Sequence, residues 1–300
     1  MPATRHRFRH AEDRSRRTAT GAVEVGDEVQ DSHGSGTLSQ PRPGWRKRQV
    51  LRVRLTQAAQ RLWGRPCRDA ELAFVVATYR QTELLERCLG DLRRFYPRAT
   101  LLVVADGDPD PRLEPICARA AGTLLRGERL KLPGLGGAYW QRMAQAFADT
   151  GCEYLVKVDP DSRFERRFRY LSRAGFFGTV IGRDTPYHHV QGGCQVLRRR
   201  TVLRWLASGL LDDPVYRDVD GWCEAGPLRQ RLLDYQQRSG VLAVDHMLFD
   251  MMRRLGVRAV PWHEVACWWP RPPLCPRGLF AITHPHPLAA AEPRGDAPPL

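Results

Sequence analysis

From residue 71 onward, short apolar runs alternate with segments whose apolar positions recur at helical spacing. The runs LAFVVAT (72–78) and TLLVVAD (100–106) are rich in β-branched residues, which is typical of buried strands. A helical pattern follows each of them, in QTELLERCLGDLRRF and in PRLEPICARAAG. Further strands are expected at TLLRG and at YLVKVD (154–159), with the glycine turn and helix of GLGGAYWQRMAQAFADTG between them. This alternation predicts an α/β fold whose mostly parallel central sheet is flanked by helices.

The second half of the chain has a less regular pattern. It offers strands at GTVIG (178–182), HVQGGCQVL (189–197) and RAVPW (258–262), and helices near 199–208 and 242–255. We therefore expect the regular sheet to be completed by a less regular half.

The two ends of the chain lack the pattern of a folded domain. Residues 1–46 contain few large apolar residues and show no periodicity, and residues 287–300 are rich in Pro and Ala. Both are expected to be disordered tails, the first of them basic. Residues 47–70 are expected to form an amphipathic helix and linker. Residues 71–286 are expected to form one domain, long enough to bury a sizeable core.

The amphipathic segment permits two interpretations. Its apolar positions lie at helical spacing within 50–63, with several arginines between them. The helix either packs on the domain, which we favour, or rests on an anionic lipid surface. The residues concerned are Leu51, Leu55, Ala58, Ala59 and Leu62, with Arg52, Arg54 and Arg61.

The chain is strongly basic, with a net charge of +14, and only Lys47, Lys131 and Lys157 among its 47 basic residues are lysines. Such a charge favours phosphate-bearing substrates or acidic lipid, whereas the excess of arginine is also what a GC-rich coding sequence produces. Nucleic acid is not an expected partner. The 8 cysteines form no Cys-x-x-Cys pair, and neither a spanning segment nor a secretory signal is present, so we expect a reduced cytoplasmic protein, with peripheral membrane contact as the alternative.

Candidate chemistry gathers where the predicted strands end, which is where open α/β sheets bind their ligands. The most informative place is Asp159-Pro160-Asp161, directly after the strand YLVKVD. Carboxylates two residues apart in extended chain project to one side, so both can face one hard cation such as Mg²⁺ or Mn²⁺. A turn is the alternative interpretation of the same tripeptide.

The order of five motifs along the chain resembles that of GT-A-fold glycosyltransferases, in the nucleotide-diphospho-sugar transferase superfamily. The motifs are VVATYRQTELLERCL, LLVVADGD, LVKVDPDSRF, GGCQVLRRRTV and DHMLFDMMRRLGV, and they extend over about residues 71–286. From Lys157 onward the chain is also similar to the β-galactosyltransferase and Fringe-type branch. The resemblance implies a GT-A-type sheet, with the less regular half on the acceptor side.

The resemblance assigns a metal site. In such enzymes a post-strand Asp-x-Asp holds the cation that binds the nucleotide diphosphate, and Asp159 and Asp161 match it. A late histidine is often a further ligand; FAITHPHP offers His284 and His286, of which His284 follows an apolar run and is preferred, although either would also suit a solvated tail. The implied cofactor is Mn²⁺ or Mg²⁺.

The resemblance also assigns substrate-contacting positions. The end of the first strand would contact the nucleoside and an acidic residue after the second strand the base or ribose. The glycine turn fails the G-x-G-x-x-G dinucleotide pattern but can approach a phosphate or sugar, or be a plain loop. The second glycine pair would lie under the sugar and acceptor, or form a β-bulge. The residues that match the family are Thr78, Tyr79, Arg80, Asp106 and Asp108 for the nucleotide, and Gly192 and Gly193 for the donor and acceptor pocket. The glycine-rich helix start adds Gly136 and Gly137 to that pocket as candidates.

Inverting members of the family deprotonate the acceptor with a carboxylate, usually one of an acidic pair that opens a helix. Here Asp245-His246 stands at that point, so only one carboxylate remains. Asp245 fits the base, provided that burial raises its pKa, and it also fits a helix N-cap. The departure from the pair leaves retaining chemistry open.

The expected function is metal-dependent transfer of a sugar from a nucleotide-sugar, a UDP-sugar first, to a hydroxyl on a glycan, lipid or small molecule. A nucleotidyltransferase is a weaker alternative, because ATYRQTE has no glycine after the first strand. A non-catalytic basic protein that binds nucleic acid or a membrane is the third, and it predicts strong salt dependence without a metal.

Overall fold

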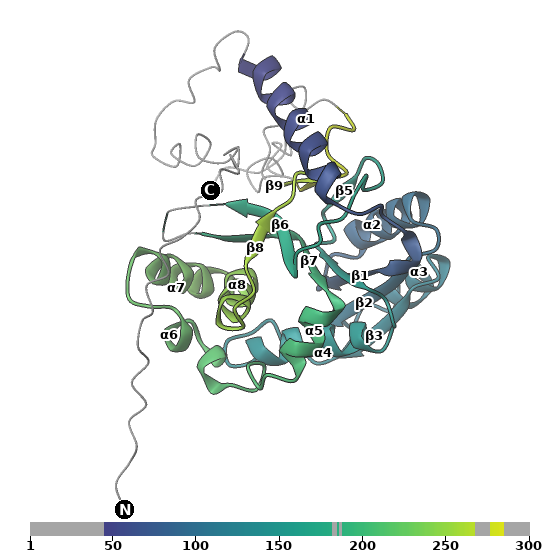
Figure 1. The fold of residues 1–300 in the computed structure, drawn as a ribbon. Helices are drawn as coiled ribbons and strands as arrows, with labels where there is room; N and C mark the ends of the chain where they lie inside the picture. The colour runs from purple at the N-terminus through teal and green to yellow at the C-terminus, as the bar shows by residue number, and fades with distance from the viewer. Residues whose placement is uncertain (1–44, 182–184, 186–187, 268–276, 285–300) are drawn as a thin grey trace, which may run out of the picture.

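The computed structural model describes residues 45–181, 185, 188–267 and 277–284 (Figure 1). Its main sheet has seven strands in the order β3-β2-β1-β4-β7-β6-β8, and a small sheet has the order β5-β10-β9. The strands β3, β2, β1 and β4 are parallel, whereas β7 is antiparallel to β4 and β6. The strands of the main sheet are β1 (Leu72–Thr78), β2 (Thr100–Asp106), β3 (Thr123–Gly127), β4 (Tyr154–Val158), β6 (Phe176–Ile181), β7 (His189–Arg198) and β8 (Ala259–Pro261).

Helices cover both faces of the main sheet. Alternate residues of a strand point to opposite faces, and on the central strands both sets are apolar and need to be buried. On β1, Leu72, Phe74 and Val76 pack with α2 and α3, whereas Ala73 and Val75 pack with α4, α5 and α8. The predicted α/β architecture, a mostly parallel sheet flanked by helices, is confirmed. The helices are α1 (Trp45–Trp63), α2 (Thr82–Phe95), α3 (Leu113–Arg119), α4 (Gly136–Ala148), α5 (Arg199–Leu206), α6 (Val219–Trp222), α7 (Pro227–Ser239) and α8 (Val244–Arg254), with 3-10 turns at Asp69–Glu71 and Pro214–Arg217.

The small sheet brings the end of the described chain to the carboxyl end of β4. It consists of β5 (Arg163–Phe164), β9 (Val265–Cys267) and β10 (Ile282–His284). Strand β5 follows Asp159-Pro160-Asp161 almost at once and pairs with β10 through Thr283 and Arg163. Strand β7 lies beside β4 on the other side, and Asp159 N–H donates to Gly193 O at 3.3 Å. Segments far apart in sequence therefore meet at this one place.

Helix α1 packs through one row of side chains onto the segment that leads into β10. Val53 is fully buried with Ala266, Leu279 and Phe280. The Gln57 side-chain amide donates to His263 O at 2.6 Å and to Leu279 O at 2.8 Å. The preferred interpretation of this helix, packing on the domain, therefore holds for one of its faces. Among the described residues, no helix is both long and apolar enough to cross a bilayer.

Candidate functional site

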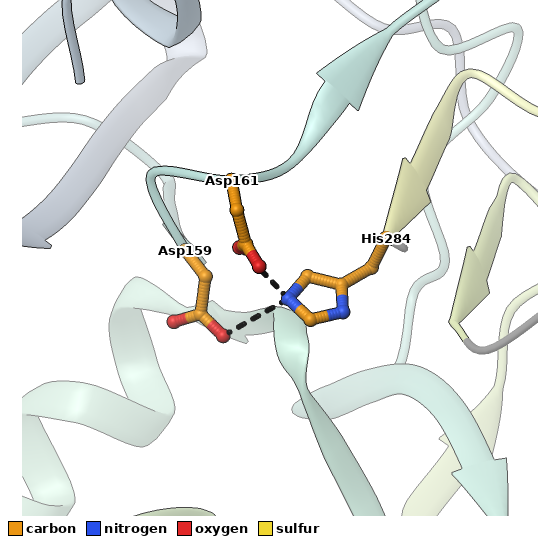
Figure 2. Close-up of side chains that lie close together, drawn as sticks. All are labelled: Asp159, Asp161 and His284. Atoms are coloured by element: carbon orange, nitrogen blue, oxygen red, sulfur yellow. Dashed lines mark ion pairs between the residues drawn. The ribbon is translucent and has the colours of Figure 1, made fainter. Parts of the chain in front are cut away.

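Asp159, Asp161 and His284 form a compact group at the carboxyl end of β4. His284 Nε2 lies 2.9 Å from Asp161 Oδ1 and 3.5 Å from Asp159 Oδ2. Figure 2 shows both carboxylates pointing toward the imidazole, with His284 projecting from β10. The ligand atoms of the three side chains all lie within 4.8 Å of one another. The expected projection of Asp159 and Asp161 to one side is therefore what the turn produces. His286, the other histidine considered, lies outside the described residues.

The donor set of this group fits a divalent cation. Both ring nitrogens of His284 are buried, and neither is aligned for a hydrogen bond with a described residue, although two carboxylate oxygens lie close to Nε2. Two carboxylate oxygens and one imidazole nitrogen suit Mn²⁺, and Mg²⁺ accepts the oxygens more readily than the nitrogen. With three protein ligands, coordination positions remain for substrate oxygens and water.

The electrostatics of the group show how strongly it attracts positive charge. Burial alone would lower the pKa of His284, but Asp159 and Asp161 outweigh it and raise the pKa to about 9. Burial would likewise raise the pKa of Asp159, but Lys157 and His284 hold it well below its usual range. This point of the structure therefore holds positive charge, either as a proton on His284 or as a metal ion.

Lys157 forms an ion pair with Asp159 and was not among the predicted site residues. It is 3% exposed, and its ammonium donates to Asp159 Oδ1 at 2.5 Å and to Gly192 O at 2.6 Å. Burial would lower the pKa of Lys157, but Asp159 and Tyr139 outweigh it and the net shift is upward. Lys157 occupies one oxygen of Asp159 and leaves Oδ2 facing His284. The sequence signal was a lysine inside an otherwise apolar strand.

Replacing Lys157 with methionine tests this support. The variant leaves Asp159 without its cationic partner, and we expect unfolding to become easier by about 1–3 kcal/mol, less than for a fully buried pair because 33% of the Asp159 side chain is exposed. Urea denaturation measures the difference. Mn²⁺ should recover part of the loss, since it neutralises the same carboxylate; a variant as stable as the parent would show that the pair contributes nothing.

The glycine pair of β7 makes room for two site side chains. A Cβ on Gly193 would lie 2.6 Å from His284 Cδ2, and a Cβ on Gly192 would lie 3.1 Å from Asp245 Cγ. The pairing of β6 with β7 passes from Gly178–Gln195 to Val180–Val190, so the extra residues of this irregularity lie on β7 and include the glycine pair. The β-bulge alternative is therefore supported. Contact of the pair with sugar or acceptor stays a prediction.

Gly193→Ala should therefore displace His284. We expect Mn²⁺ affinity to fall roughly tenfold, as when a ligand's supporting contact is lost. Gly90→Ala, in the exposed part of α2 where a Cβ meets nothing within 4 Å, is the matched control and should leave metal binding unchanged. Calorimetric titration with Mn²⁺ compares the two, and equal affinities would disprove the steric link between Gly193 and His284.

Asp245 lies against Gly192 of β7. It is the second residue of α8, whose N-cap is Ala243, so the alternative that Asp245 caps this helix is wrong. The His246 ring stacks on His189 with centroids 3.6 Å apart. Burial alone would raise the pKa of Asp245, but His246, His189 and Lys157 outweigh it and lower the pKa. The expectation of a raised pKa is therefore wrong, because the neighbouring basic side chains shift the pKa of Asp245 downward.

The carboxylates of Asp106 and Asp108 already have protein partners. Asp106 accepts from Leu130 N–H at 2.6 Å and from Lys131 N–H at 3.2 Å. Asp108 accepts from Arg80 N–H at 2.6 Å and from Asp110 N–H at 3.1 Å. These bonds fix the loops that follow β2 and β3, so contact with a base or ribose would have to share the same oxygens.

Residues that follow β1 and β2 line a recess. The Thr78 hydroxyl is buried and has no hydrogen bond with a described residue. Arg129 stacks on the Tyr79 ring at 3.7 Å from its centroid, with Arg80 at 5.1 Å. Beside them is a cavity of about 320 Å³ lined by Arg80, Thr82, Glu83, Asp108, Pro109, Asp110, Pro111 and Arg112. The structure thus brings the candidate nucleotide residues of β1 and β2 to one edge of the sheet, as the parallel order requires.

Gly136 and Gly137 open helix α4 and are buried by packing. A Cβ on Gly136 would clash with Met247 and Leu242, and one on Gly137 would clash with the Leu211 carbonyl. The pair therefore lets α4 approach α8 and the loop after α5 closely. Their place in a donor pocket stays a prediction.

Comparison with known proteins adds little. No family model and no curated protein matches the chain. One matching solved structure is the mannosyltransferase PcManGT from Pyrobaculum calidifontis in complex with GDP-Man and Mn²⁺, with a TM-score of 0.39 and 15% sequence identity. The alignment covers 71% of this chain and 65% of the mannosyltransferase, so this chain spans slightly less than two-thirds of that protein's length. A match this distant assigns neither family nor activity, and nothing in it distinguishes the β-galactosyltransferase and Fringe-type branch.

Proposed function

We propose that this chain is a metal-dependent glycosyltransferase that moves a sugar from a nucleotide-sugar, a UDP-sugar first, to a hydroxyl acceptor. The observation that carries the proposal is the group of Asp159, Asp161 and His284 at the carboxyl edge of a mostly parallel sheet. Ligands of open α/β sheets bind at that edge, and the donor set suits Mn²⁺ or Mg²⁺. The candidate nucleotide residues of β1 and β2 lie along the same edge.

The charge of the site suits a diphosphate. A divalent cation together with Lys157 exceeds the charge of Asp159 and Asp161 by one, so the centre favours an anionic ligand. When bound, such a cation neutralises the charge that builds on a departing nucleoside diphosphate. Asp159, Asp161 and His284 would hold the cation, and Lys157 keeps Asp159 oriented.

Asp245 is our choice for the proton acceptor. It faces Gly192, one residue from the glycine that packs against His284, so it lies close to the metal group without belonging to it. A carboxylate in this position can take the proton of an acceptor hydroxyl as the oxygen attacks the sugar carbon, which is the inverting arrangement. Its lowered pKa makes it a weak base, so positioning has to supply most of the effect.

Titration with UDP, with and without Mn²⁺, tests the proposal. We expect Mn²⁺ to tighten UDP binding by about tenfold or more, because the cation joins the diphosphate to the carboxylates. GDP and dTDP in parallel identify the nucleotide. UDP binding that ignores the metal, or binding of nucleic acid that depends steeply on salt and not on Mn²⁺, would contradict the proposal and favour the non-catalytic basic protein.

A further inference from the structure

Helix α1 has two rows of side chains, one packed on the domain and one exposed. Residues spaced four, three and four apart share one face of a helix. The row Val53, Gln57, Gln60 and Gly64 packs on the domain: Val53 is buried, and Gln60 donates to Pro261 O at 2.9 Å and accepts from the Tyr170 hydroxyl at 2.5 Å. A Cβ on Gly64 would lie 3.0 Å from the Tyr170 ring. The helix is thus fixed to the domain through this row.

The opposite row is apolar and exposed. Leu51, Leu55 and Leu62 are 58%, 63% and 83% exposed, and Trp63 at the end of the helix is 80% exposed. Ala58 completes the spacing and is also exposed. No described element covers this row, and Figure 1 shows α1 projecting from the domain beside β5 and β9. Large apolar side chains at helical spacing on one outward face need an apolar partner.

Charge indicates what that partner is. The helix contains no Asp or Glu, and its six basic residues include Lys47, Arg54 and Arg61, which are spaced seven apart and therefore run along one border of the apolar row. Arg48 and Arg52, spaced four apart, lie along the other border. An apolar stripe between two basic borders suits the surface of an anionic membrane. The apolar side chains can enter the acyl region, while the basic side chains on either side contact the headgroups. Trp63 has the amphipathic ring that favours this interface.

We propose that α1 docks the protein on an anionic lipid surface, with Leu51, Leu55, Leu62 and Trp63 inserted and the flanking basic residues on the headgroups. The proposal goes beyond the proposed function and does not depend on it. It has one structural consequence for that function. The Gln57 side chain donates to His263 O and to Leu279 O, and Leu279 lies three residues before β10, which carries His284.

Sedimentation with lipid vesicles tests the docking on the full chain. Vesicles of phosphatidylcholine mixed with phosphatidylglycerol should retain the protein, and pure phosphatidylcholine should retain much less. The triple variant Leu51→Gln, Leu55→Gln and Leu62→Gln keeps every charge and a good helix former at each position, and should bind the anionic vesicles roughly tenfold more weakly or worse. Leu203→Gln, an exposed leucine of α5, is the matched control and should bind as the parent does.

A second pair of variants separates charge on α1 from charge in general. Arg54→Gln with Arg61→Gln should weaken binding more than Arg200→Gln with Arg238→Gln, which removes the same charge from exposed positions on α5 and α7. This comparison also covers the case in which the triple variant loses helix, which circular dichroism would reveal. The proposal is overturned if the triple leucine variant binds anionic vesicles as the parent does. It is equally overturned if the parent ignores vesicles and instead forms a dimer that the triple variant cannot form.

Discussion

Asp161→Asn is expected to weaken Mn²⁺ binding by roughly a hundredfold or more and to abolish the metal-dependent part of UDP binding, because it removes a charged oxygen ligand while keeping the shape of the side chain. Asp161 is the cleaner of the two aspartates to replace. Asp159 also pairs with buried Lys157, so its loss would unbalance that cation as well. Among the described residues, the Asp161 carboxylate has an ion pair with His284 alone. The electron paramagnetic resonance signal of free Mn²⁺ measures the affinity.

The control for this experiment is Asp212→Asn. Asp212 is exposed in the loop after α5 and is none of the three candidate ligands. The Asp212→Asn variant removes the same charge, so it should leave Mn²⁺ and UDP binding unchanged. Equal loss in both variants would attribute the effect to net charge. Mn²⁺ affinity that survives Asp161→Asn would remove Asp161 from the metal site, and with it the main support for the proposed function.

The central strands could be predicted from sequence because they are buried on both faces. The apolar runs 72–78 and 100–106 coincide with β1 and β2, since no polar face interrupts them. Helix α7 was missed for the opposite reason: of its 13 residues only Leu232 is buried, so it has no apolar stripe to detect. Strands β9 and β10 have 3 residues each and pair with distant segments, so the apolar run before His284 was the one local signal that the sequence analysis used there.

The candidate site divides in the same way. Asp159 and Asp161 were found because their spacing and their place after a strand are local properties. His284 was chosen only through the family resemblance and its apolar context, and its approach to Asp161 depends on β10 pairing with β5. Lys157 was missed because a strand pattern does not reveal that one buried lysine meets a carboxylate two residues later. That Gly192 and Gly193 make room for Asp245 and His284 follows from tertiary packing alone.

The pKa of Asp245 was also beyond the sequence. An isolated carboxylate at a buried helix start is expected to have a raised pKa, and two histidines and Lys157 reverse the direction. His246 is adjacent in the chain, but His189 reaches Asp245 only because β7 packs against α8. Burial alone therefore predicts the wrong sign for this acid, because the fold places basic side chains beside it.

Asp245→Asn is expected to lower the transfer rate by about a hundred- to ten-thousand-fold, the range for loss of a general base, while Mn²⁺ and UDP binding persist. Asparagine keeps the volume beside Gly192 but cannot accept the acceptor proton. The assay has two readouts: UDP affinity in the presence of Mn²⁺, and sugar transfer with a nucleotide-sugar found to bind. Asp234→Asn, which removes an exposed carboxylate of α7, is the control and should alter neither.

The split between the two readouts decides what Asp245 does. Loss of transfer with intact nucleotide binding assigns it to the proton step. Loss of both would place Asp245 in the support of Lys157 and the metal group, because its charge acts on the same buried cation. Retained transfer would remove Asp245 from the mechanism and with it the argument for inversion, since no second carboxylate stands beside it in the chain. A retaining enzyme would then explain the same metal group, because the cation serves the leaving diphosphate in either case.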